Sequence, residues 1–283
     1  MKIAAVERNP LHSPAMVDND RAILGATARK LMQAGHSVHI MPAPPTNEAY
    51  DAIITMTRTA PSLDTLQRLE ERGTTILNRP AAVRRCSRQL FTHILSQNNI
   101  PQPPHCIIES IGEPPREGYP QWIKRADGWS CHPQDVSFAQ SPDEAKEAIE
   151  KMRSRGIERI ICSRHIEGDI IKFYGVSGSG GSAPFFALHH PDANKTKFGL
   201  ERYNGPCRHH PFDPTYLQAT AFAAARAIGL DIFGGDCIVS PDGKIHIIDI
   251  NDFPSFTAFR DKAAEAIATL TIERVKEKNE RTR

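Results

Sequence analysis

The chain has 283 residues, 40% of them hydrophobic and 24% charged, which is typical of a folded globular protein with one large or two modest domains. Its formal net charge of +2, without interleaved basic and aromatic residues, argues against a nucleic acid partner. The sequence has no apolar window of roughly 18 residues and six dispersed cysteines without a CxxC pair, so we expect no membrane partner and a cytoplasmic location with free thiols.

Residues 1–79 alternate short apolar runs with amphipathic segments, a pattern typical of strands and helices stacked on a parallel sheet. The expected strands lie at 2–6, 36–41, 50–56 and 74–78, and the expected helices at 19–34 and 62–73. Gly35 and Gly73 come where a left-handed residue commonly ends a helix. No GxGxxG motif follows the first strand, so a dinucleotide-binding domain is not predicted.

From residue 80 onward we expect mixed and more antiparallel sheets. A single helix is predicted over 80–99, with Pro80 in its first turn, where a missing N–H costs nothing. After a proline-rich linker, the expected strands lie at 121–128, 159–168, 169–178, 183–190, 231–240 and 244–251, and the expected helices at 141–156, 215–229 and from about 256 onward. The charged tail at 276–283 has no apolar side chain to bury, so we expect it to fray.

The last two predicted strands carry three oxygen-bearing side chains. Antiparallel pairing through the turn at 241–244 brings Asp236 near Asp249 and Asn251, which share one face of their strand because they are two residues apart. Two carboxylates and an amide oxygen are ligands suited to Mg²⁺, or alternatively Mn²⁺. A single Asp here would more simply end a strand or cap a turn, but three such residues after apolar runs favour a metal site.

Two lysines on predicted strands are candidates for binding anions. Lys124 ends an apolar strand and precedes a loop with Gly128 and Ser130, whose backbone N–H groups suit phosphate oxygens. Strands also commonly end in a solvated lysine, so this signal is weak by itself. Lys172 lies inside an apolar strand, and its periodicity does not distinguish a solvent-facing side chain from one held by a partner.

The order of these features over roughly residues 78–260 resembles the ATP-grasp superfamily. The most specific part is the Gly-Gly-Asp of 234–236 followed by the Asp-x-Asn-x-x-Pro ending at 249–254. The resemblance implies an α/β (α+β) protein whose two lobes, 80–165 and 166–283, clasp ATP. Residues 1–79 are similar to the small parallel-sheet domain that usually precedes that fold.

The resemblance also implies roles for individual residues. Lys124 falls on the phosphate-binding lysine, and Gly128 and Ser130 on the flexible loop over the phosphates, although Trp129 departs from the small residues usual there. Arg88 stands near the usual second nucleotide-binding lysine and would replace it, unless it faces solvent. The other implied contacts are adenine recognition by the backbone at Arg164 and Ile166, ribose recognition by Asp169, and Mg²⁺ coordination by Asp236, Asp249 and Asn251.

Two reactions are compatible with this resemblance. Carboxylate-amine ligases of the ribosomal-protein glutamate ligase type form an acyl phosphate and release ADP and phosphate, and they carry an Arg-x-Asn pair that Arg202 and Asn204 match. Inositol trisphosphate 5/6-kinases have an ending like Asp249-Ile-Asn and a strand lysine like Lys172. The substrate would be a carboxylate-bearing small molecule or peptide, or else a phosphorylated polyol. Ligation is our first interpretation; a non-catalytic nucleotide-binding protein and a homo-oligomer remain open.

Two histidine pairs, His189–His190 and His209–His210, raise the question of a further metal site. Neighbouring residues on a strand point to opposite faces, so the two rings of one pair do not easily reach one ion. We therefore expect the pairs to have structural roles.

Overall fold

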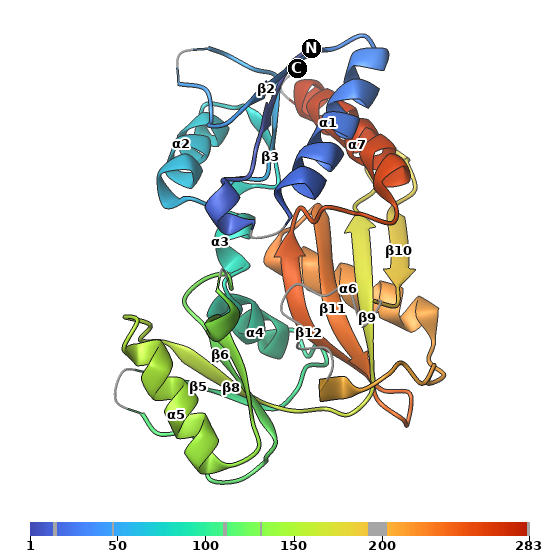
Figure 1. Ribbon diagram of the computed structural model, residues 1–283. Helices are drawn as coiled ribbons and strands as arrows, with labels where there is room; N and C mark the ends of the chain where they lie inside the picture. The colour runs from blue at the N-terminus through green and yellow to red at the C-terminus, as the bar shows by residue number, and fades with distance from the viewer. Residues whose placement is uncertain (14–15, 47, 110–111, 131, 192–202, 282–283) are drawn as a thin grey trace.

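A computed structural model describes residues 1–13, 16–46, 48–109, 112–130, 132–191 and 203–281. Within these ranges the chain forms three four-stranded sheets and seven α-helices (Figure 1). Two short 3-10 helices, η1 (Pro10–His12) and η2 (Pro133–Asp135), complete the described elements. None of the helices in the described ranges is long and apolar enough to cross a membrane.

Sheet A is the parallel sheet predicted near the N-terminus. Its strand order is β2-β1-β3-β4, and all its strand pairs are parallel. The strands are β1 (Lys2–Val6), β2 (Ser37–Met41), β3 (Ala52–Thr55) and β4 (Thr75–Leu77), and the helices between them are α1 (Val17–Gln33) and α2 (Ala60–Glu71). The predicted parallel α/β arrangement of this region is confirmed.

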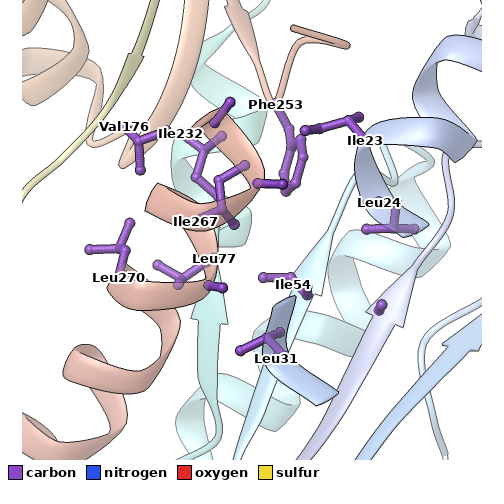
Figure 2. Close-up of a cluster of buried hydrophobic side chains, with 14 of the residues drawn as sticks. Ile23, Leu24, Leu31, Ile54, Leu77, Val176, Ile232, Phe253, Ile267 and Leu270 are labelled. Atoms are coloured by element: carbon purple, nitrogen blue, oxygen red, sulfur yellow. The ribbon is translucent and has the colours of Figure 1, made fainter. Parts of the chain in front are cut away.

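The core of sheet A includes the far end of the chain. Helix α7 (Arg260–Arg281) packs beside α1, and both termini lie at this end of the molecule (Figure 1). Figure 2 shows Leu24 and Leu31 of α1 in one buried cluster with Ile267 and Leu270 of α7. Val176 and Ile232 extend this cluster toward the C-terminal sheet, so the N-terminal sheet shares a continuous core with the last third of the chain.

Sheets B and C are antiparallel, as expected for the rest of the chain. Sheet B has the order β5-β8-β6-β7, with β5 (His105–Ile108), β6 (Gln121–Arg125), β7 (Val136–Ala139) and β8 (Ile160–Arg164), and it packs against α5 (Pro142–Arg153). Sheet C has the order β10-β9-β11-β12, with β9 (Asp169–Val176), β10 (Phe185–His189), β11 (Ile232–Val239) and β12 (Ile245–Asp252), and it packs against α6 (Pro214–Ile228).

The single helix predicted over 80–99 is wrong. Two helices, α3 (Pro80–Arg85) and α4 (Arg88–Gln97), are separated by Cys86 and Ser87, and the Ser87 ψ of 141° is extended. The first turn of α4 is hydrogen-bonded to the residue after β6: the Gln89 N–H donates to the Ala126 carbonyl at 3.0 Å. The break therefore places the start of α4 against the end of β6. Core residues of both helices pack with sheet C, although the predicted division at 79/80 grouped them with the central lobe.

The prediction that the charged tail frays is also wrong as far as Arg281. Helix α7 continues to that residue, and Glu277 accepts hydrogen bonds from Ser179 Oγ at 2.6 Å and from the Gly180 N–H at 2.9 Å. The tail thus has polar partners that its composition does not reveal.

Candidate functional site

A row of charged side chains crosses three strands of sheet C. Asp236 of β11 lies opposite Lys172 of β9 on one side and Asp249 of β12 on the other. Directly opposed residues of antiparallel strands project from the same face, so the three side chains are neighbours. Lys172 Nζ lies 2.9 Å from Asp236 Oδ1, which answers the question its sequence left open: the lysine is held by a partner inside the site.

A β-bulge in β12 sets this register. Asp236 pairs with Asp249, whereas the next residue, Cys237, pairs with Ile247, so Ile248 is the extra residue of the bulge. As a result both Ile248 and Asp249 line the cleft described below. Two residues further on, Asn251 keeps the face of Asp249, and its Nδ2 donates to Asp249 Oδ2 at 3.1 Å.

Gly234 lies two residues before Asp236 on β11, between two residues that line the cleft. It lies opposite Asn251 of β12 and Tyr174 of β9. A Cβ atom at this position would approach Pro254 Cγ to 2.8 Å, closer than packed carbon atoms normally come. The glycine therefore lets Pro254 close over the end of the strand pair beside Asn251.

The donor set at this position fits Mg²⁺. The side chains of Asp236 and Asp249 are 27% and 28% exposed, so their oxygens are open to the cleft. Carboxylate and amide oxygens are the hard ligands that Mg²⁺ prefers, and few protein ligands leave room for water and phosphate oxygens. The structure thus brings Asp236, Asp249 and Asn251 together on one face, as the spacing predicted.

Two cations share a cleft of about 810 Å³ with these oxygens, and the cleft is lined by residues of sheets B and C and by residues next to sheet A. Lys124, near the end of β6, lines this cleft, and burial followed by the nearby Arg88 charge lowers the pKa of Lys124 to about 8. Asp249 and Asp236 oppose this shift and favour the charged form. The lysine therefore remains mostly protonated at neutral pH, with few fixed counter-charges around it.

Arg88 points into the cleft, so the solvent-facing alternative is wrong. Its side chain is 11% exposed, and Nη1 donates to the Arg125 carbonyl at 3.0 Å and to Ser130 Oγ at 3.2 Å. Nη2 lies 3.9 Å from Asp249 Oδ1. Nε is buried and has no hydrogen-bond partner within the described ranges.

The loop after β6, which the resemblance places over the phosphates, borders the cleft. Gly128, Trp129 and Ser130 line the cleft. Trp129, which departs from the expected small residues, packs toward the N-terminal domain: Arg58 lies 5.1 Å above its ring, and His12 stacks on it at 6.2 Å. The tryptophan thus makes the loop part of the wall shared with sheet A.

The hinge between sheets B and C contains the predicted adenine-contacting segment. Arg164 and Ile166 line the cleft, and so does Asn204. The Arg164 N–H donates to the Pro104 carbonyl at 2.9 Å, and Asn204 Nδ2 donates to the carbonyls of Ile166 and Gly168 at 3.2 and 3.4 Å. Asn204 therefore holds the hinge backbone at one wall of the cleft. Its predicted companion Arg202 lies outside the described residues.

Asp169 is the predicted site residue that the structure does not bring to the cleft. Along β9, Ile170, Lys172 and Tyr174 line the cleft, so the alternation of the strand turns Asp169 to the opposite face. Its carboxylate accepts the N–H groups of Arg208 and His210, each at 2.6 Å. Burial by itself would raise the pKa of Asp169, but these N–H donors, together with the His210 charge and the Cys207 side chain, outweigh burial and hold the pKa below its ordinary value.

Sequence reasoning missed the part of the cleft that borders sheet A. Asn19 of α1 and Arg58, which follows β3, line it together with Ser255 and Thr257. Their positions depend on contacts between segments about 200 residues apart, and no local pattern marks them. Cys86 also lines this wall, but burial raises the pKa of its thiol well above the ordinary value, so it is not a ready nucleophile.

Solved structures with the same fold cover nearly the whole chain. A D-alanine-D-alanine ligase from Coxiella burnetii superposes with a TM-score of 0.70 at 14% identity, over 100% of this chain and 97% of the ligase. A D-alanine-D-alanine ligase from Bacillus anthracis complexed with ATP gives 0.66 at 11% identity, over 99% of both chains. A RimK domain ATP-grasp protein from Sphaerobacter thermophilus gives 0.63 at 19% identity, over 96% of this chain and 100% of that one.

No protein-family model and no curated protein sequence matches the chain. The assignment of the fold therefore rests on the likeness to solved structures, which covers nearly the whole chain and so includes the parallel N-terminal sheet and both antiparallel sheets. The chain has the fold of the ATP-grasp superfamily.

Proposed function

We propose that the protein is an ATP- and Mg²⁺-dependent ligase that joins a carboxylate to an amine or a related nucleophile. The observation that carries this proposal is the cleft, in which Lys124 and Arg88 face the oxygens of Asp236, Asp249 and Asn251. Cations and metal-binding oxygens in one cleft suit a triphosphate bound through a metal ion. The ligases among the structural neighbours, one of them with bound ATP, support the same choice.

The metal-binding oxygens, the two cations and the hinge backbone have separate roles in this proposal. Asp236, Asp249 and Asn251 would hold Mg²⁺, which when bound neutralises charge on the phosphates. Lys124 and the guanidinium of Arg88, whose Nη2 lies 3.9 Å from Asp249 Oδ1, would contact phosphate oxygens directly. At the hinge, the Ile166 N–H has no acceptor among the residues described, and it is the backbone donor that we assign to the adenine edge.

The acceptor site would lie where the cleft borders sheet A. Arg58, which pairs with buried Asp252, borders this part of the cleft, and Asn19, Ser255 and Thr257 supply hydrogen-bonding groups that suit a carboxylate-bearing small molecule or peptide. In the reaction, a carboxylate oxygen would attack the γ-phosphorus and release ADP. The amine would then attack the carbonyl carbon and release phosphate, so the residues mainly position the reactants and neutralise charge.

The test is a substrate screen with two parallel readouts. The protein is incubated with ATP, Mg²⁺ and pools of amino acids, dipeptides and phosphorylated polyols, and both ADP and inorganic phosphate are measured. We expect equal amounts of ADP and phosphate with an amine- and carboxylate-containing pool, and about 10²–10³-fold slower formation of both by the Asp249→Asn variant.

Two other outcomes would overturn the proposal in favour of its alternatives. ADP without free phosphate, in the presence of a phosphorylated polyol, would identify a kinase, for which the Lys172–Asp236 pair beside Asp249 is the feature in favour. Tight Mg²⁺-dependent ATP binding without ADP formation in any pool would identify a nucleotide-binding protein without turnover.

A further inference from the structure

We propose that His190, Cys207 and His209 form a binding site for a thiophilic divalent metal ion of the Zn²⁺ class. The three side chains are solvent-exposed, and their ligand atoms all lie within 4.8 Å of one another. This site is separate from the carboxylate row of the cleft and does not rest on the proposed ligase function.

The two sulfur–nitrogen distances in the cluster match those of ligands that share one ion. Cys207 Sγ lies 3.4 Å from His190 Nδ1 and 3.7 Å from His209 Nδ1. For tetrahedral zinc with ordinary Zn–S and Zn–N bonds, the sulfur and nitrogen ligands are about 3.6 Å apart. Both Sγ–Nδ1 distances lie close to this value, so one ion can contact the sulfur and both ring nitrogens.

The strand geometry explains how the histidine pairs contribute. His189 lies opposite Lys172 at the end of β10 and lines the cleft, so the next residue, His190, turns away from it. In the second pair, His209 turns its ring toward Cys207, and the rings of His190 and His209 are 5.3 Å apart. Each pair thus supplies one ring, which avoids the geometric objection to a site built from a single pair.

The backbone around Cys207 and His209 is fixed in place before any metal binds. The buried carboxylate of Asp169 accepts the N–H groups of Arg208 and His210, which flank His209 on both sides. His209 has a φ of 55°, a left-handed conformation that a non-glycine residue adopts only when its surroundings hold it. The role that the sequence suggested for Asp169, ribose binding, is therefore replaced by one as the anchor of this loop.

The ligand set defines the chemistry of the bound ion. One thiolate and two imidazoles favour Zn²⁺ and similar ions over Mg²⁺ or Ca²⁺, which prefer oxygen. Three protein ligands leave a fourth position for water or another small ligand. The ion would join the end of β10 to the segment before α6, next to the part of the cleft that His189 and Pro191 line.

Metal titration of the full chain tests the site. Metal-free protein is titrated with Zn²⁺, and separately with Co²⁺ as a spectroscopic probe, in excess Mg²⁺ so that the carboxylate row is occupied. We expect one equivalent of Co²⁺ to bind with tetrahedral d–d bands and a thiolate-to-cobalt charge-transfer band. Zn²⁺ should displace the Co²⁺ and raise the melting temperature.

The variants separate ligands from neighbours. Cys207→Ser and His209→Asn should each weaken Zn²⁺ binding by more than about 100-fold, and asparagine tolerates the left-handed backbone that position 209 requires. His210→Gln and Cys106→Ser are matched controls that should bind Zn²⁺ like the wild type. Equal melting temperatures of the metal-free proteins would establish that the variants fold.

Two results would overturn the proposal. One is Co²⁺ binding without the charge-transfer band in the wild type. The other is a charge-transfer band that survives in Cys207→Ser, since the thiolate would then come from another cysteine.

Discussion

Two carboxylates on β12, Asp249 and Asp252, lie three residues apart and have opposite surroundings. Asp249 is 28% exposed in the cleft, and its nearest cation, Arg88, is 3.9 Å away. Asp252 is fully buried on the other face, where Arg58 Nε donates to it at 2.7 Å and Arg8 Nη1 lies at 3.7 Å. One carboxylate is available to a ligand, whereas the other is consumed by the protein itself.

The buried cluster joins the N-terminal domain to sheet C. Arg8 Nη2 donates to the Phe253 carbonyl at 2.6 Å, and Arg8 Nε donates to Asp20 of α1 at 3.0 Å. A buried charge that loses its partner costs far more than an exposed one. An aspartate on β12 therefore serves stability or is available for ligand binding according to the face of the strand on which it lies.

The largest expected effect is on stability, from Asp252→Asn. The substitution keeps the shape but removes the charge that pairs with two buried arginines, so the free energy of unfolding should fall by about 3–5 kcal/mol. Urea denaturation measures it. A loss similar to that of an exposed pair would break the distinction between the two carboxylates.

Asp249→Asn should lower turnover strongly and stability only slightly. Once a substrate is identified, turnover should fall by about 10²–10³-fold because one metal-binding charge is lost, while the free energy of unfolding should change by about 1 kcal/mol or less. Steady-state kinetics and urea denaturation of the same preparation give both numbers. Normal turnover by a folded variant would remove Asp249 from the site.

Nucleotide affinity should depend on pH through Lys124. Its folded-state pKa of about 8 lies below its ordinary value of 10.5, so the charged lysine destabilises the fold below pH 8, and this cost disappears as the pH rises toward 10.5. Phosphate binding needs the charged form, so ATP affinity should weaken about tenfold between pH 7 and pH 9. Calorimetric titrations at several pH values measure this change.

The Lys124→Arg variant provides the control for that pH dependence. Its guanidinium stays charged throughout this range, so its affinity should be independent of pH between 7 and 9. If the wild type is equally insensitive, the charge of Lys124 does not contribute to nucleotide binding.

The smallest expected effect is that of Lys172→Met on stability. The Lys172–Asp236 pair is 28% and 27% exposed, so its loss should lower the free energy of unfolding by about 1 kcal/mol or less. Arg58→Met, which breaks the pair with buried Asp252, is the matched comparison and should cost several-fold more. Equal losses in the two variants would contradict the assignment of one cluster to the cleft and the other to the core.

The parts of the site that follow from local periodicity could be predicted from the sequence. The i, i+2 spacing predicted that Asp249 and Asn251 share a face, and the turn at 241–244 predicted that Asp236 joins them. The same alternation, applied to β9 from Lys172, excludes Asp169 from the cleft, but the family resemblance outweighed it in the prediction.

Other features depend on tertiary contacts that no local pattern encodes. The break at Ser87 coincides with the hydrogen bond between Gln89 and Ala126, in a segment whose residues are all compatible with one helix. Arg58 reaches the cleft because its partner Asp252 lies 194 residues away. The cluster of His190, Cys207 and His209 needs β10 and the anchored loop to meet, which the spacing of the two histidine pairs does not predict.

The most direct test of the central claim is the Mg²⁺ dependence of ATP binding in three proteins: the wild type, Asp249→Asn and Asp252→Asn. Calorimetric titration with and without Mg²⁺ should show Mg²⁺-enhanced affinity in the wild type and in folded Asp252→Asn, and its loss in Asp249→Asn. Undiminished Mg²⁺ enhancement in Asp249→Asn would contradict the assignment of the cleft as a metal-nucleotide site.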